Sequence, residues 1–450
     1  MSRLPTAARA AALCAALVPA AVLATHAAPA LAVPPQAVID QYARQAGVDT
    51  VTAQRQLQLQ DKAPDVVTAL ESALGDRFGG TWFDTRRGTF HVSLTTPAAR
   101  KAAEEVLAAR GVLANVDFET ARFGLRELRD RARDLTTKLE KRLAKGEATL
   151  EVDVRANAVK VGIDRKAAKQ VKDEVKGQAL GSAAAKAAPG AAGPVEVAEV
   201  GDETIARADF TACAWSHRCT RPLRGGTYIE GRGAGFPGAC TAGYAAFYPP
   251  TGDRYLYTAG HCLRGGQPQI WSAYNDDNVV LRDIGQSAGV IVGAYGDVGS
   301  IKVTRGGFWD TQLQPIIVAW AGTWGCFGCV IDETWTVQDR TRSFPNQFVC
   351  TNGAGSMGIS CGFVLRVGIP VISSGELLGN MTETSVCGHG GDSGAPVMRD
   401  HWALGIQSSS TIVRETGECG NPPRSYHTEV LDAEALLLNS RIVTSVTGPR

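Results

Sequence analysis

The sequence has almost no excess of charge of either sign. Its 46 Lys and Arg residues balance 45 Asp and Glu residues, so that the formal net charge is +1. This balance predicts no general attraction to nucleic acid or to acidic membranes. Hydrophobic residues make up 44% of the 450 residues, which suits a globular protein with a core and roughly two or three domains.

Each half of the chain lacks residue types that the other half contains. Before residue 210, Trp82 is the only tryptophan and Cys14 is the only cysteine. Lysine shows the opposite distribution, because Lys302 is the only lysine after Lys186. This asymmetry indicates two units with different physical tasks.

Long hydrophobic runs are missing except near the N-terminus. There, two arginines and an apolar stretch at 10–23 precede a small-x-small sequence at 30–32, which is the order of a secretory signal peptide. We therefore predict a signal peptide at 1–32 and a secreted, extracellular protein. A membrane anchor is the disfavoured alternative, because Pro19 interrupts the run and a span needs ~20 apolar residues. Export places the ten cysteines that follow Cys14 in an oxidising compartment, where disulfides form.

The residues from 33 to 207 predict an α+β unit. Apolar residues near helical spacing predict helices at 36–59, 97–109 and 120–145. Strand-like pieces predict two hairpins, which suggest a loose internal duplication: 81–84 with 89–92, and 150–154 with 158–161. The stretch from 176 to 194 is rich in Ala, Gly, Ser and Pro, which is the composition of a linker.

After Phe210 the sequence predicts an all-β unit. Short apolar runs alternate with clusters of Gly, Pro, Asn and Asp, a pattern typical of a β-barrel or sandwich. One helix is expected near the end, at 432–440.

Two short segments of this unit carry groups suited to nucleophilic catalysis. His261 follows a strand-like run, and Ser393 lies in the glycine-rich sequence GGDSGAP. A serine hydroxyl becomes a good nucleophile when an imidazole takes its proton, provided that a carboxylate orients the imidazole. The glycines would let the backbone N–H groups of Gly391 and Ser393 converge on an oxyanion.

The carboxylate has to come from the chain between these two segments. The candidates are Asp276, Asp277, Asp283, Asp297 and Asp310. Asp297 is favoured because a small-or-apolar strand follows it, which would bury the carboxylate against the imidazole. Asp283 is the alternative.

The order of these segments resembles the chymotrypsin family, in particular its bacterial secreted branch, the streptogrisins and α-lytic protease. His261, Asp297 and Ser393 follow the chain order of that family, and Cys387 stands six residues before the serine, as it does there. The resemblance covers most of 210–445, and the preceding segment resembles the pro-regions of the family more loosely. It implies two antiparallel six-stranded β-barrels, at about 220–305 and 315–445, with the catalytic triad between them.

The same resemblance implies a precursor. Residues 33–207 would be a pro-region that assists folding and is then removed, with the maturation site at about 195–212, and residues 208–450 would be a serine protease domain. The implied activity is a secreted serine endopeptidase that forms an acyl-enzyme on Ser393. Its partners would be protein or peptide substrates and its own pro-region; we expect a monomer that needs no nucleic acid, cofactor or metal. The alternative is a catalytically inactive binding protein with a protease fold. An α/β-hydrolase is excluded, because Ala395 stands where its nucleophile elbow needs glycine.

Disulfide pairing also follows from the resemblance. The implied pairs are Cys240–Cys262, Cys387–Cys419, Cys350–Cys361 and Cys213–Cys219. Cys326 and Cys329 remain as a Cys-x-x-Cys sequence. A structural disulfide between them is favoured over a redox pair or half a zinc site, because the sequence shows neither a βαβ pattern nor a second unassigned ligand pair.

The expected substrate pocket departs from the family pattern. Ser408, Ser409 and Ser410 form its wall, where many relatives have glycines. Ser410 and His427 resemble the glutamate-selective streptogrisin, but Gln407 stands where that enzyme has a histidine. A pocket for small, polar or acidic side chains and a pocket for larger apolar ones both stay open.

A second departure concerns Asp392, which the family keeps buried against a cation. In the bacterial branch an arginine usually follows the cysteine at position 350, but here Thr351 does. The expected cation is therefore Arg366 or Arg414.

Overall fold

The computed structural model of the protein describes residues 36–144, 148–163, 195–199, 223–232, 239–264, 270–275, 280–309, 313–320, 331–356, 358–411, 419–437 and 439–444. Several predictions lie outside these residues. They are the signal peptide, the linker at 176–194, the maturation site apart from 195–199, the Cys213–Cys219 and Cys326–Cys329 pairs, and the candidates Asp276, Asp277, Asp310 and Arg414. None of the helices in the described part of the chain is both long and apolar enough to cross a membrane.

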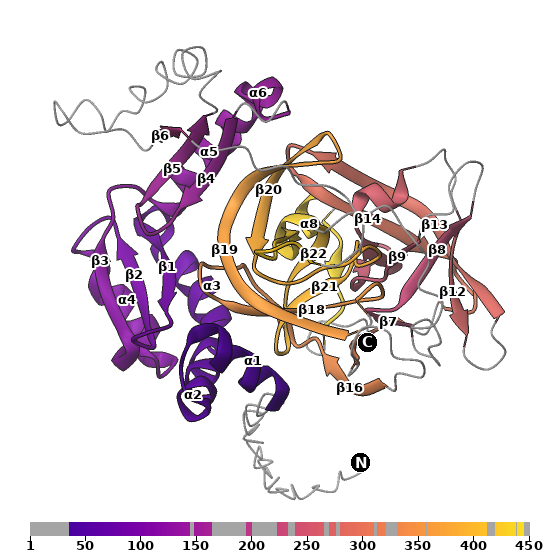
Figure 1. Ribbon diagram of the computed structural model, residues 1–450, viewed down its shortest axis with the longest axis horizontal. Helices are drawn as coiled ribbons and strands as arrows, with labels where there is room; N and C mark the ends of the chain where they lie inside the picture. The colour runs from indigo at the N-terminus through magenta and orange to yellow at the C-terminus, as the bar shows by residue number, and fades with distance from the viewer. Residues whose placement is uncertain are drawn as a thin grey trace, which may run out of the picture. The chain divides into compact units, whose positions relative to one another are not determined.

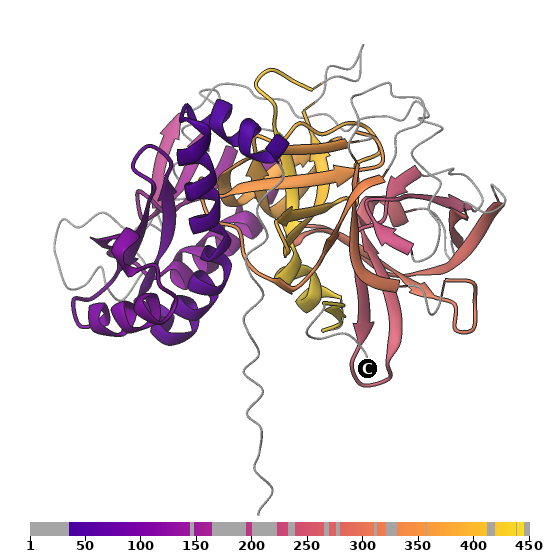
Figure 2. The same cartoon turned by 90° about the horizontal axis from the view of Figure 1, so that it is seen from below.

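The described N-terminal part contains six α-helices where the sequence predicts three, and the one at 63–74 was not predicted. They are α1 (Gln36–Ala46), α2 (Thr50–Asp61), α3 (Ala63–Leu74), α4 (Ala99–Ala109), α5 (Leu125–Lys138) and α6 (Glu140–Ala144). The single helix expected at 36–59 is wrong: Gly47 takes a φ of 68° and ends α1, and the carboxylate of Asp49 caps α2 by accepting from Thr52 N at 2.8 Å. The indigo helices are accordingly separate segments (Figure 2).

Two three-stranded pieces of sheet repeat the same plan. Their strands are β1 (Phe78–Asp84), β2 (Thr89–Leu94) and β3 (Val116–Thr120), and β4 (Ala148–Asp153), β5 (Ala158–Ile163) and β6 (Val195–Glu199). In each, an antiparallel hairpin is followed by a third strand parallel to the second. Both hairpin turns begin with an aspartate that accepts backbone N–H groups, Asp84 or Asp153, and end with a left-handed residue, Gly88 or Asn157. The duplication expected from the two hairpins therefore extends to the third strands.

The C-terminal half contains two curled sheets, which confirms the prediction of an all-β unit (Figure 1). The first contains β8 (Tyr228–Arg232), β9 (Ala239–Thr241), β10 (Ala245–Tyr248), β11 (Asp253–Thr258), β12 (Ile270–Asn275), β13 (Val280–Gly293), β14 (Gly296–Val303) and β24 (Arg441–Ile442). Apolar side chains fill its interior, among them Leu256, Trp271 and Ile301. The strand β24 pairs with β10, so a segment expected in the second barrel completes the first sheet.

The second curled sheet contains a closed ring of six strands. They are β18 (Phe348–Gly353), β19 (Gly358–Ser373), β20 (Glu376–Thr384), β21 (Pro396–Arg399), β22 (Trp402–Ser410) and β23 (Ser425–Glu429). The ring closes because β18 pairs with both β19 and β21. Outside it, β17 (Asp339–Arg340) pairs with β22, and a separate sheet is formed by β7 (Leu223–Gly225), β15 (Leu313–Trp320) and β16 (Ile331–Thr336). Helix α8 (Val430–Leu436) follows β23 and ends earlier than the helix predicted at 432–440.

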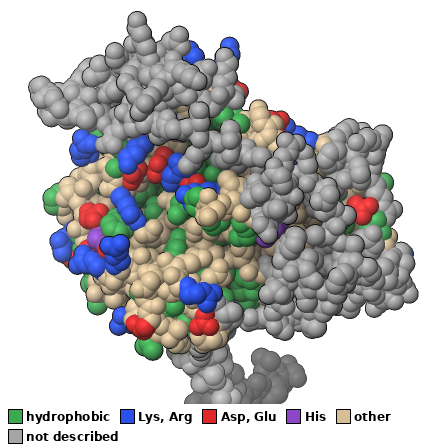
Figure 3. Space-filling model, in the orientation of Figure 1, with side chains coloured by type: hydrophobic (Ala, Val, Ile, Leu, Met, Phe, Trp, Pro, Cys, Tyr) green, Lys and Arg blue, Asp and Glu red, His purple; other side chains and the backbone are tan. Residues whose placement is uncertain are grey.

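Charged side chains of both signs are interspersed on the described part of the face that Figure 3 shows. This mixture agrees with a net charge near zero and gives that face no single-sign patch.

Candidate active site

His261 lies in a 3-10 turn, η4 (Gly260–Leu263), directly after β11. A disulfide between Cys262 and Cys240 ties this turn to β9. The turn packs closely against β13, because a Cβ on Gly260 would lie 2.3 Å from the carbonyl oxygen of Ile291. The glycine before the histidine is therefore needed for this approach.

Asp297 is fully buried near the start of β14 and faces His261. Its Oδ2 lies 2.5 Å from Nδ1 of His261, and its Oδ1 accepts from the backbone N of His261 at 2.8 Å. Ser408 also donates its hydroxyl to Oδ2, at 2.5 Å. Burial alone would raise the pKa of Asp297, but the facing imidazole and these hydrogen bonds outweigh it and lower the pKa to about 2. The group is therefore a fixed carboxylate at neutral pH.

Ser393 lies on the other side of the imidazole, in the loop between β20 and β21. Its Oγ is 2.9 Å from Nε2 of His261 and 3.1 Å from the carbonyl oxygen of Ser408. The structure thus brings the three predicted residues into one chain of carboxylate, imidazole and hydroxyl. Asp283 is not part of it, because this residue is exposed and accepts a hydrogen bond from Ser272 at 2.7 Å.

The turn that carries Ser393 is held by a residue that the sequence analysis did not single out, Thr241. Its Oγ1 donates to the carbonyl oxygen of Gly391 at 2.6 Å and accepts from Ala354 N at 3.0 Å. Its backbone N donates to Ser393 O at 2.8 Å, and its side chain is fully buried. Thr241 follows Cys240 in the first curled sheet and fixes the peptide plane that precedes Asp392 and the one that follows Ser393.

Replacing Thr241 by Val should lower kcat roughly ten- to hundredfold with a small change in KM, because the peptide planes around the nucleophile lose their alignment. Thr241→Ser should restore most of the rate, since it keeps the hydroxyl. Steady-state kinetics on a peptide substrate would measure both values. A Thr241→Val enzyme with normal kcat would contradict this positioning role.

The surroundings of Asp392 differ from those expected. Its carboxylate accepts from the backbone N atoms of Ser356 and His389, each at 2.8 Å, and from the hydroxyl of Ser356. Arg366, one of the two cations considered, is paired with Glu383 instead. Burial raises the pKa of Asp392, although these hydrogen bonds and the nearby His389 oppose the rise. Among the described residues, hydroxyl and backbone donors surround the carboxylate, and Arg414, the other cation considered, lies outside them.

A glycine makes this arrangement possible. A Cβ on Gly353 would lie 2.0 Å from Oδ1 of Asp392. The loop after β18 can therefore close over the carboxylate only with glycine at this position. Sequence reasoning missed Ser356 because nothing in its local sequence marks it, 36 residues before Asp392.

The predicted wall residues have different environments. Ser408 turns its hydroxyl to Asp297, as described above, whereas Ser410 hydrogen-bonds to Gln407 and Ser425. Ser409 is buried. The imidazole of His427 is 1% exposed, with Nε2 at 3.2 Å from Ser343 Oγ and 3.5 Å from a carboxylate oxygen of Glu429. His427 is therefore buried against Ser343 and Glu429 and is not exposed on the predicted wall.

Three of the disulfides implied by the resemblance are present: Cys240–Cys262, Cys350–Cys361 and Cys387–Cys419. Two clusters in the described part of the chain place His261 or His389 beside two cysteines, as a metal site would. In both, the cysteines are joined in a disulfide and offer no thiolate, the form that binds metals. Neither cluster fits a metal ion in this state.

Comparison with known proteins agrees with the sequence-based resemblance. Residues 51–112 match the family described as "Alpha-lytic protease pro N-terminal". Serine protease 1 of Rarobacter faecitabidus is 24% identical over 394 residues, which are 87% of this chain. The chain spans 62% of that relative's length. The predicted resemblance to bacterial proteases of the α-lytic type that are made with a pro-region is confirmed.

Solved structures of bacterial proteases are also similar. Thermobifida fusca Protease A is 20% identical, with a TM-score of 0.37 over 49% of this chain and 98% of its own. Nocardiopsis protease is 23% identical, with the same TM-score and the same coverage of both chains.

Proposed function

We propose that this protein is a secreted serine endopeptidase, with His261, Asp297 and Ser393 as its catalytic triad. The observation that carries the proposal is the continuous chain of contacts from the buried carboxylate through the imidazole to the serine hydroxyl. A similar chain activates serine in several unrelated protease folds. The alternative of an inactive binding protein is not favoured, because all three side chains are present and in contact with one another.

The geometry supports one step for each group in the proposed mechanism. Nε2 of His261 takes the proton of Ser393 Oγ as the oxygen attacks the peptide carbonyl, and then gives that proton to the leaving amine. Asp297 holds Nδ1 and stabilises the imidazolium that forms. Water, deprotonated by the same imidazole, hydrolyses the acyl-enzyme.

The oxyanion of each tetrahedral intermediate would bind the backbone N–H groups of Gly391 and Ser393. The backbone N–H groups of Asp392 and Gly394 are not available to an oxyanion. Asp392 N donates to His389 O, and Gly394 N donates to Gln407 O. Gly391 has a φ of 101°, which is accessible to glycine and strained for other residues. These hydrogen bonds and the backbone of Gly391 support the assignment of Gly391 N and Ser393 N as the two donors.

We propose that residues 1–32 direct secretion, that 33–207 form the pro-region and that 208–450 form the protease, with cleavage at about 195–212. The contacts of the described residues support a close association of the last two. Val152 of β4 pairs with Val367 of β19, so the second hairpin adds to the barrel's sheet. The backbone N of Phe348 donates to Gln60 Oε1 at 2.9 Å.

A buried ion pair also joins the two parts. Asp61 at the end of α2 contacts Arg399 of β21, and their side chains are 1% and 2% exposed. Arg399 donates in addition to Leu57 O at 2.7 Å. Removing only one member of such a pair costs free energy, because the remaining charge is left buried without a partner.

Residues 208–450 expressed alone in an oxidising host should fold slowly and give little active enzyme. The reason is kinetic, because the curled sheets depend on strand pairs that are distant in sequence. Adding residues 33–207 as a separate chain should raise the yield. The measurement is the time course of activity after refolding, and rapid, complete folding without the added chain would show that 33–207 does not assist folding.

The ion pair allows a second test, which measures the association of residues 33–207 with the mature enzyme. A 33–207 chain with Asp61→Ala should associate about 100-fold more weakly, because Arg399 then stays buried without its partner. Asp76→Ala is the matched control, since the side chain of Asp76 is 82% exposed. Equal affinities of the two variants for the mature enzyme would contradict the interface described here.

A further inference from the structure

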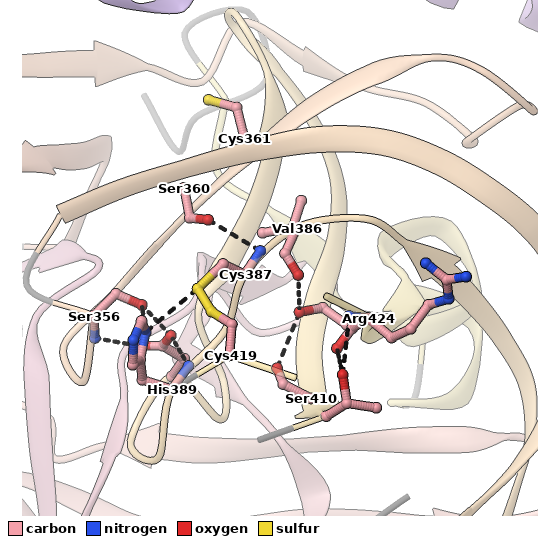
Figure 4. The surroundings of a disulfide bond; sticks show 12 residues. Ser356, Ser360, Cys361, Val386, Cys387, His389, Ser410, Cys419 and Arg424 are labelled. Atoms are coloured by element: carbon pink, nitrogen blue, oxygen red, sulfur yellow. Dashed lines mark hydrogen bonds between the residues drawn. A yellow bond between two sulfur atoms is a disulfide. The ribbon is translucent and has the colours of Figure 1, made fainter. Parts of the chain in front are cut away.

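Three side chains behind the candidate nucleophile form a closed hydrogen-bond group, the Gln407–Ser410–Ser425 relay. Nε2 of Gln407 donates to Ser410 Oγ at 3.0 Å and to Ser425 Oγ at 3.3 Å. The two hydroxyl oxygens are 3.0 Å apart. Ser425 Oγ also donates to the carbonyl oxygen of Val386 at 2.8 Å (Figure 4).

The Val386 carbonyl determines the direction of every hydrogen in the relay. A carbonyl oxygen only accepts, so the single hydrogen of the Ser425 hydroxyl is committed to it. Ser425 Oγ can then only accept from Ser410, which commits the hydrogen of Ser410. The amide group that faces both hydroxyls must be the NH₂ of Gln407, and its two hydrogens are used as well. The relay therefore has no donor left over, and its unused capacity is a lone pair on Ser410 Oγ.

The position of the relay relates it to the candidate active site. Ser410 is two residues beyond Ser408, whose carbonyl oxygen lies 3.1 Å from Ser393 Oγ. On the other side, a Cβ on Gly388 would lie 2.0 Å from Ser410 Oγ, so the loop that leads to the nucleophile packs directly on the relay. The disulfide Cys387–Cys419 lies beside this loop (Figure 4).

All three members of the relay are buried, and Ser410 is the least buried of them. Ser410 is 7% exposed, whereas Gln407 is 2% and Ser425 is 1% exposed. His427 is no substitute donor, because it is 1% exposed and lies against Glu429 and Ser343. Ser410 is thus the member of the relay through which a substrate side chain would contact it.

We infer that this wall selects a donor-bearing side chain, in particular the carboxamide of glutamine or asparagine, at the residue before the scissile bond, and that it disfavours the isosteric acid. The inference rests on the proposed function. A carboxamide N–H can donate to Ser410 Oγ, whereas a carboxylate at the same place meets only another acceptor and loses its hydration. A site built for a hydrogen bond can reject an analogue that lacks the required group by large factors.

The test uses peptide substrates that differ only at that residue, with Gln, Glu or Leu, at pH 8, where the glutamate is ionised. We expect kcat/KM for Gln to exceed that for Glu at least tenfold. Equal rates, or faster cleavage after Glu, would overturn the inference. The Leu substrate separates this failure from failure of the proposed function, because an inactive protein would cleave none of the three.

A variant tests the direction of the hydrogens. Ser425→Ala frees the hydroxyl hydrogen of Ser410, which can then donate to a carboxylate, so the Gln-to-Glu ratio of kcat/KM should fall toward one. The matched control is Ser287→Ala, which removes a hydroxyl that accepts from Trp271 in the first curled sheet and should keep the ratio. Organofluorophosphonate labelling of each variant verifies that it is folded. An unchanged ratio in a labelled Ser425→Ala enzyme would contradict the relay.

Discussion

Replacing Ser393 by Ala abolishes peptide hydrolysis in the mechanism proposed here and leaves the fold intact. The hydroxyl is the attacking group, whereas the methyl group of alanine fits the same space. Removing the nucleophile in enzymes of this kind lowers kcat by about 10⁶-fold. The precursor should also stay uncleaved if maturation is autocatalytic. The measurements are peptide hydrolysis, labelling by an organofluorophosphonate and gel analysis of the secreted product.

The control for this variant is the wild-type chain, which should carry the label at Ser393 in stoichiometric amount. A wild-type protein that is folded but takes up no label would favour the inactive binding protein instead. Circular dichroism distinguishes an unlabelled folded chain from an unfolded one.

The second large effect concerns the carboxylate. Asp297→Asn should lower kcat about 10⁴-fold, because an amide in place of the acceptor no longer selects the imidazole tautomer that can take the serine proton. The substitution would also alter the hydrogen bond that the Ser408 hydroxyl donates to Oδ2 of Asp297 in the wild-type structure. Because the pKa of Asp297 is held at about 2, the wild-type carboxylate is ionised at neutral pH. The substitution therefore replaces a full negative charge with a neutral amide.

Asp283→Asn provides the matched control. Asp283 was the alternative from the sequence, but it is exposed and bonds to Ser272 in the structure. The Asp283→Asn enzyme should keep a near-normal kcat. The assignment of Asp297 is wrong if Asp297→Asn remains active while Asp283→Asn does not.

The sequence predicted those parts of the site that depend on short segments. His261 and Ser393 stand in local sequences whose glycines have clear backbone roles, and Asp297 was favoured by the strand that follows it. The supporting contacts could not be predicted in this way. Thr241 is 150 residues from Gly391, and Ser408 is 111 residues from Asp297. Such pairs depend on how two sheets meet, which local patterns do not encode.

The same distinction explains the corrections to the fold. The sequence predicts one helix over 36–59, yet Gly47 adopts a left-handed conformation and Asp49 provides a cap for a new helix. At Asp392 the described residues supply Ser356 and backbone amides, Arg366 pairs with Glu383 instead, and Arg414 lies outside the described residues. A substitution at one family position, Thr351, is accommodated by residues elsewhere in the chain.

The pairing of β24 with β10 has a consequence for the order in which the protein can complete its fold. Ile442 is opposite Ala246, so the last strand that the structure describes pairs along one edge of the first curled sheet. In an exported chain that emerges from its N-terminus, every strand of the second barrel becomes available before this partner does. During this interval the backbone groups at this edge of β10 can pair with another chain. Secreted chains truncated before residue 441 should remain protease-sensitive in β10, and the full chain should protect it.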